Sequence, residues 1–165
     1  MKKSLTLSSC ILLLVVLAAA SENERSEEPY KSAVVGSLPN EMIGGVASGG
    51  LPWVVSKGEA KIHKDGKLQV EVRGLVLSGP GVPANLEGTT GPVTDVRASL
   101  VCGGSGGAVV ATTDPVTLTP TGDARIQAQI EVPERCIGPI VLVRIGGTTS
   151  APPPILGGWI AASGL

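Results

Sequence analysis

The chain has 165 residues, of which 42% are hydrophobic and 16% are charged, and its formal net charge is −1. This length allows one domain with tails, and the near-neutral charge lacks the basic excess of nucleic-acid-binding proteins. One His and three Cys exclude multi-His metal enzymes, zinc fingers and dense disulfide scaffolds. We therefore expect neither a metal nor another cofactor.

The first 20 residues have the pattern of a signal peptide. Two lysines precede an uncharged stretch, residues 4–20, which ends in the small residues Ala18–Ala20. This order predicts export and cleavage, with Ser21 as the first mature residue. Two alternatives stay open, namely an uncleaved membrane anchor and lipidation at Cys10. With cleavage, we expect a secreted, periplasmic or cell-envelope protein without a membrane span.

Cleavage would leave two cysteines, Cys102 and Cys136. In an exported chain, two cysteines most simply form one disulfide. The loop that this bond would close, of about 35 residues, corresponds to a stabilisation of about 3.5–4 kcal/mol in the chain-entropy model. Two buried free thiols are the alternative.

The residues after the predicted cleavage site are acidic. Residues 21–49 hold five acidic and two basic side chains, whereas residues 50–165 hold nine of each. Because residues 21–28 lack any apolar period, we expect a solvated, flexible tail there. Residues 29–50 are either a linker or a short additional strand. The predicted organisation is therefore a signal peptide over 1–20, a tail and linker over 21–49, and one domain over 50–165.

From Trp53 onward, apolar and polar residues alternate with a period of two, which predicts half-buried strands. The longest alternation runs from Ala124 to Val132. Residues 140–145 are apolar except for Arg144, which favours a more central strand. Further strands are predicted near 68–72, 96–102, 107–112, 116–119 and 157–163.

One hairpin can be predicted together with its register, around a turn at residues 64–66. A two-residue loop would put Ile62 opposite Gln69. A three-residue loop with Gly66 in the left-handed conformation puts Ile62 opposite Leu68 and keeps the apolar face continuous, so we favour it.

The many short strands separated by turn signals predict an all-β fold. We expect a single antiparallel β-sandwich, immunoglobulin-like in the loose sense, with one disulfide. A small β-barrel is the alternative.

Residues 103–107 match G-x-S-x-G, the nucleophile elbow of hydrolases. The order His63, Asp95, Ser105 also matches the chain order of the trypsin-like triad. However, residues 108–110 predict a strand where the elbow needs a helix, and no His follows Ser105. A flexible glycine hairpin is therefore favoured over a catalytic serine.

Trp53 and Trp159 are two of only three aromatic residues. Sugar-binding modules present exposed aromatic rings, so these two residues are the candidate ligand-binding pair if they meet at one end of the domain. Packing in the core is the favoured alternative. So few aromatic residues also argue against single-stranded nucleic acid as a partner.

Three stretches, taken together, resemble small exported bacterial proteins of unknown function, and the likeness spans about residues 34 to 165. The stretches are Gly50–Val55, Gly122–Cys136 and Gly158–Gly164. The resemblance implies export, one disulfide and an all-β domain, and no biochemical role comes with it.

These observations predict a non-catalytic exported domain that binds a ligand or is a structural component outside the cytoplasm. Its expected partner is a protein or a glycan of the envelope or the extracellular space, and not nucleic acid. The alternatives are a glycan-binding module that uses Trp53 and Trp159, and a serine hydrolase centred on Ser105.

Overall fold

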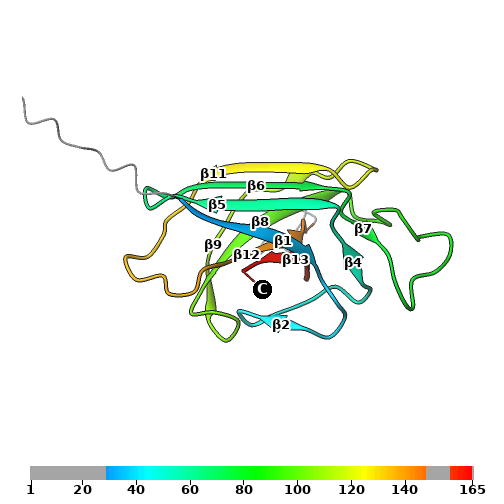
Figure 1. The fold of residues 1–165 in the computed structure, drawn as a ribbon, viewed down its shortest axis with the longest axis horizontal. Helices are drawn as coiled ribbons and strands as arrows, with labels where there is room; N and C mark the ends of the chain where they lie inside the picture. Colours follow the sequence, from blue (N-terminus) through cyan, green and yellow to red (C-terminus); the bar gives the residue numbers. More distant parts are fainter. Residues whose placement is uncertain (1–28, 148–156, 165) are drawn as a thin grey trace, which may run out of the picture.

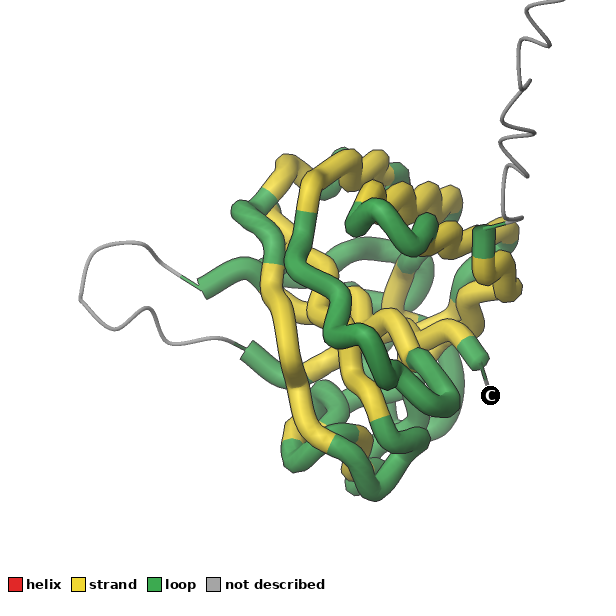
Figure 2. The backbone as a smooth tube through the Cα atoms, turned by 90° about the vertical axis from the view of Figure 1, so that its left-hand side faces the viewer, coloured by secondary structure: helices red, strands yellow, loops and turns green. Residues whose placement is uncertain are grey.

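The computed structural model describes residues 29–147 and 157–164. Their regular structure consists of β-strands, and none of them forms a helix that could cross a membrane (Figure 2). The predicted signal peptide, residues 1–20, lies outside the described residues. The strands are β1 (Tyr30–Gly36), β2 (Met42–Ile43), β3 (Val46–Ala47), β4 (Trp53–Val54), β5 (Lys57–Ile62), β6 (Lys67–Arg73), β7 (Val76–Leu77), β8 (Asp95–Cys102), β9 (Ala108–Thr112), β10 (Val116–Thr117), β11 (Ala124–Gln129), β12 (Ile140–Ile145) and β13 (Trp159–Ser163).

Nine of these strands form one curled antiparallel sheet, with the order β10-β8-β12-β13-β1-β5-β6-β11 and with β9 also paired to β8 (Figure 1). Strand β1 joins the two halves, because Tyr30–Ala33 pairs with β5 and Val34–Gly36 pairs with β13. In the described sheet, β11 at one edge is not paired with β9 or β10 at the other. The sheet is therefore a half-barrel.

The all-β antiparallel class predicted from the sequence is confirmed. The division into two separate sheets is not confirmed, because the sheet is continuous through β1. The sheet also begins at Tyr30, so the domain starts well before the predicted boundary at residue 50. The sequence of β1 does not show the alternation typical of a strand, because only Val34 is buried. A strand that pairs with β5 over one half and with β13 over the other does not keep one regular solvent-exposed face.

The predicted register of the β5–β6 hairpin is confirmed. Ile62 lies opposite Leu68, and Gly66 has a φ of 88°. The Asp65 carboxylate accepts a hydrogen bond from the backbone N–H of Lys67 at 3.0 Å. Asp65 thus closes the turn through its side chain, while Gly66 provides the left-handed backbone.

Gly66 also allows a close approach between segments, because an added Cβ would collide with the carbonyl oxygen of Ile130. We expect Gly66→Ala to lower the free energy of unfolding by about 2–4 kcal/mol, from left-handed strain plus overpacking. Gly45 is the matched control, since its φ is 76° and a Cβ there would meet nothing within 4 Å. Gly45→Ala should cost only about 1 kcal/mol. Equal losses in urea unfolding would contradict the role of the close approach.

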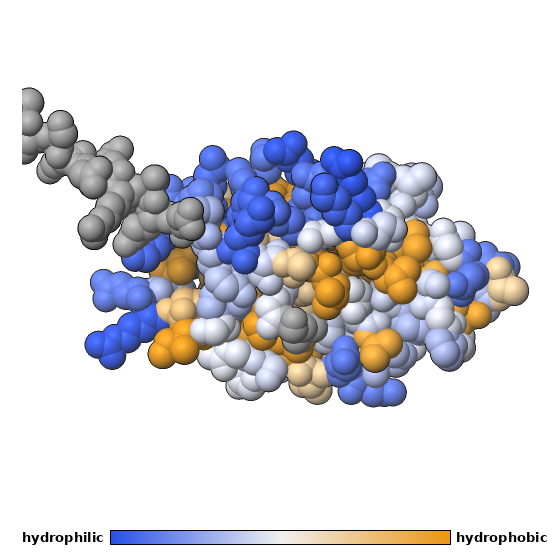
Figure 3. All heavy atoms as spheres, in the orientation of Figure 1, coloured by the Kyte–Doolittle hydropathy of each residue, from blue (hydrophilic) through white to orange (hydrophobic). Residues whose placement is uncertain are grey.

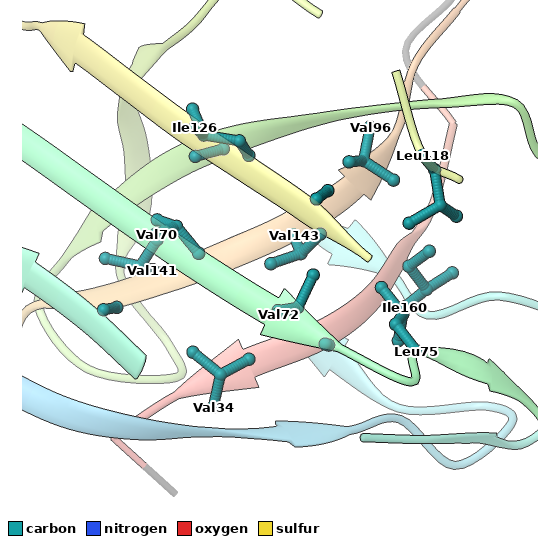
Figure 4. Close-up of a cluster of buried hydrophobic side chains, with 14 of the residues drawn as sticks. Val34, Val70, Val72, Leu75, Val96, Leu118, Ile126, Val141, Val143 and Ile160 are labelled. Atoms are coloured by element: carbon teal, nitrogen blue, oxygen red, sulfur yellow. The ribbon is translucent and has the colours of Figure 1, made fainter. Parts of the chain in front are cut away.

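The main core fills the space between the two halves of the sheet (Figure 4). Val70, Val72 and Ile126 point inward from β6 and β11, and Val96, Val141 and Val143 meet them from β8 and β12. The alternation predicted from the sequence places these side chains on one face of each strand.

A second, smaller core lies on the outer face of β8, β12 and β13. The β2–β3 hairpin, which turns at Gly44 and Gly45, covers this face, and its Ile43 packs there together with Val101 and Trp159. These strands are therefore buried on both faces, which explains why the sequences of β12 and β13 are nearly continuous apolar runs.

The outer face of β5 and β6 is hydrophilic (Figure 3). Glu59 lies directly opposite Glu71, a pairing that is unfavourable by itself. Lys31 and Lys61 each contact Glu59 at 2.7 Å. The hydrogen bond from Lys31, and to a smaller degree the one from Lys61, lower the pKa of Glu59. This carboxylate therefore remains ionised on the solvent-exposed face.

Candidate functional site

The connection between β11 and β12, residues 130–139, links β11 at one edge of the sheet to β12 in the other half. At its start, the backbone N–H of Ile130 donates to the carbonyl of Gly66 in the β5–β6 turn, at 2.9 Å. Towards its end, Cys136 forms a disulfide with Cys102, the last residue of β8. The predicted disulfide is thus confirmed, and it ties this connection to the sheet.

A cleft of about 580 Å³ lies beside this connection, within the range typical of small-molecule sites. His63, Lys64 and Glu134 contribute polar groups to it. Its walls come from the start of β1, the ends of β5 and β8, and the connection itself. The apolar side chains that line it include Tyr30, Ile62, Leu100, Val132 and Pro139.

A second hollow, of about 710 Å³, continues from the first along the same connection. The two share Val132, Pro133 and Glu134, and the second extends past Val110. The second hollow therefore lies between the end of β11, at Gln129, and Val110 of β9. Ile137, on the same connection, exposes 78% of its surface.

The predicted ligand-binding pair is wrong as a surface platform. Trp53 is 5% exposed and Trp159 is 0% exposed. Trp53 belongs to the main core and Trp159 to the second core. The indole N–H of Trp159 donates to the carbonyl of Val46 at 3.1 Å, which satisfies its only polar atom. Neither ring is available to stack on a sugar.

The candidate triad does not come together. Asp95 begins β8 and Ser105 lies three residues past its end, and β8 alone spans about 23 Å at about 3.3 Å per residue. His63 faces the cleft, whereas the carbonyl of Ser105 accepts a hydrogen bond at 2.9 Å from Gly44 on the β2–β3 hairpin. A strand, β9, follows the glycine run, as predicted.

Within residues 29–147 and 157–164, the His, Cys, Asp and Glu side chains form no group of three that could hold a metal ion. Sequence reasoning did not identify the cleft residues Tyr30, Val132 and Pro139. They come from segments far apart in the chain, and only the cysteine pair pointed to the connection that borders the cleft.

Comparison with known proteins finds no matching family model, no matching curated protein and no matching solved structure. The resemblance of the three stretches to small exported proteins therefore stays a prediction.

Proposed function

We propose that this protein is an exported, non-catalytic binding module that takes a small, largely apolar ligand in the cleft beside residues 130–139. The observation that carries this proposal is an apolar cleft beside a connection that a disulfide and a backbone hydrogen bond hold in place. Such pre-organisation lowers the entropy cost of binding. Export is supported by the leader-like N-terminus and by the disulfide, a bond typical of oxidising compartments.

The chemistry of the lining indicates the ligand class. Tyr30, Val132 and Pro139 offer apolar surface, while His63, Lys64 and Glu134 offer polar groups. A ligand with an apolar body and one polar end fits this combination, because the apolar part gains by leaving water and the polar end fixes its orientation.

The uncharged fluorophore N-phenyl-1-naphthylamine tests this proposal directly. The purified protein should bind it with an increase in fluorescence, and long-chain alcohols should displace it. Val132→Trp, which places a large ring in the cleft, should weaken binding by at least about tenfold, equivalent to about 1.4 kcal/mol.

Val54→Trp is the matched control. Val54 is 43% exposed on β4, away from the cleft lining, so this variant should bind the probe like the wild type. Equal binding by Val132→Trp and the wild type would reject the cleft as the site.

A further inference from the structure

Two arginines lie side by side on the outer face of the sheet. Arg97 in β8 and Arg144 in β12 are direct register partners. Their neighbours Val96, Ala98 and Val143 face the main core, so the alternation of a strand turns both arginines to the opposite face. Side chains in such a pair begin about 5 Å apart at their Cβ atoms.

Both arginines are buried, and no acidic group neutralises them in the described part of the chain. Arg97 is 6% exposed and Arg144 is 7% exposed. Neither takes part in an ion pair among the described residues. The Nε of Arg97 has no hydrogen-bond partner there, and the Nε of Arg144 donates only to the carbonyl of Gly157, at 3.1 Å.

The nearby sequence does not provide a carboxylate either. Asp95 lies two residues before Arg97, but its carboxylate accepts a hydrogen bond from Thr94 at 2.9 Å and forms no ion pair with Arg97 in the described chain. The connection from β12 to β13, residues 146–158, contains no Asp or Glu.

This arrangement is unfavourable unless something completes it. Two neighbouring like charges repel, and a buried charge without a counter-charge costs several kcal/mol. Burial, and to a smaller degree the charge of Arg97, lower the pKa of Arg144. Arginine nevertheless stays charged at neutral pH, so deprotonation cannot relieve the repulsion.

We propose that Arg97 and Arg144 form a binding site for an oxyanion, a carboxylate, phosphate or sulfate group, on the outer face of β8 and β12. Two guanidinium groups present several N–H donors to such a group and match its oxygens in a bidentate manner. The site is independent of the proposed cleft, which Leu100 lines from the other face of β8.

Equilibrium dialysis of the purified protein against radiolabelled sulfate tests the site, and competition with phosphate and acetate distinguishes tetrahedral oxyanions from carboxylates. We expect one sulfate per chain. Arg97→Met should weaken binding by at least about tenfold, because it removes half of the donors. Arg125→Met is the matched control, since Arg125 is exposed on β11 and its loss should leave sulfate binding unchanged.

A second measurement separates binding from a purely structural role. In buffer without oxyanions, Arg97→Met should unfold at the same temperature as the wild type or higher, because it removes an uncompensated buried charge. Millimolar sulfate should raise the wild-type Tm by several degrees and leave the Tm of Arg97→Met unchanged. If Arg97→Met does not fold, Arg97→Lys is the substitute. It keeps the charge but loses the bidentate guanidinium, so it should bind sulfate more weakly than the wild type. Absent sulfate binding by the wild type, or equal binding by the arginine variants, would overturn the proposal.

Discussion

Replacing Cys102 and Cys136 together with alanine is expected to lower the free energy of unfolding by about 3–4 kcal/mol. The two cysteines are 34 residues apart, and the loop between them contains β9, β10 and β11. Without the cross-link, the unfolded chain gains the freedom of that whole loop. Urea unfolding followed by far-ultraviolet circular dichroism measures the loss, and a reductant should produce the same shift in the wild type.

The same variant should also weaken binding of the naphthylamine probe, because Cys136 holds the connection that borders the cleft. Gly45→Ala, which we expect to be only mildly destabilised, is the control for a loss of stability alone. A double variant that unfolds at the wild-type urea concentration would show that the loop is already restrained in the unfolded state.

Trp159→Ala is expected to cost about 3–5 kcal/mol, the range for deleting a large buried aromatic side chain. The ring is fully buried and is the largest side chain of the second core. Its loss leaves a cavity between the β2–β3 hairpin and the sheet, and it leaves the carbonyl of Val46 without its indole donor. Urea unfolding measures the change, with Trp53 as the remaining fluorescent reporter.

Trp159→Phe separates the two contributions to this loss. It keeps part of the ring and removes the N–H, so it should cost about 1–3 kcal/mol, the price of an unsatisfied buried acceptor. If Trp159→Ala stayed within about 0.5 kcal/mol of the wild type, as most surface substitutions do, the ring would not be a core residue.

Local structure was largely predictable from the sequence because its determinants are local. The turn chemistry of Asp65 and Gly66 and the alternation that includes Leu68 were sufficient to predict the β5–β6 register, which the structure confirms. Arg144 also stood out as the charged residue in an otherwise apolar run. Its neighbour could not be predicted, because Arg97 is 47 residues earlier and meets it only through the pairing of β8 with β12.

The architecture was harder to predict than the strands. A sandwich and a half-barrel use the same alternating segments, and they differ here in whether one strand bridges the halves. Strand β1 has this role, and its irregular pattern of buried and exposed residues resembles a linker. The two tryptophans do not form a platform because Trp53 packs in the main core and Trp159 lies under the β2–β3 hairpin. The sequence does not show that this hairpin folds over the outer face of the sheet.

The pairing of β1 with β13 has a mechanical consequence. The described chain enters the sheet at Tyr30 and leaves it at Ser163, on adjacent antiparallel strands, and the N–H of Gly164 donates to the hydroxyl of Ser32 at 2.9 Å. Both ends of the described chain therefore leave the sheet on the same side of the domain, at the adjacent ends of β1 and β13. Tension that pulls the ends apart acts on the β1–β13 ladder from its end at Val34 and Ser163. Its hydrogen bonds then break one after another instead of together, so a small force separates the two halves of the sheet.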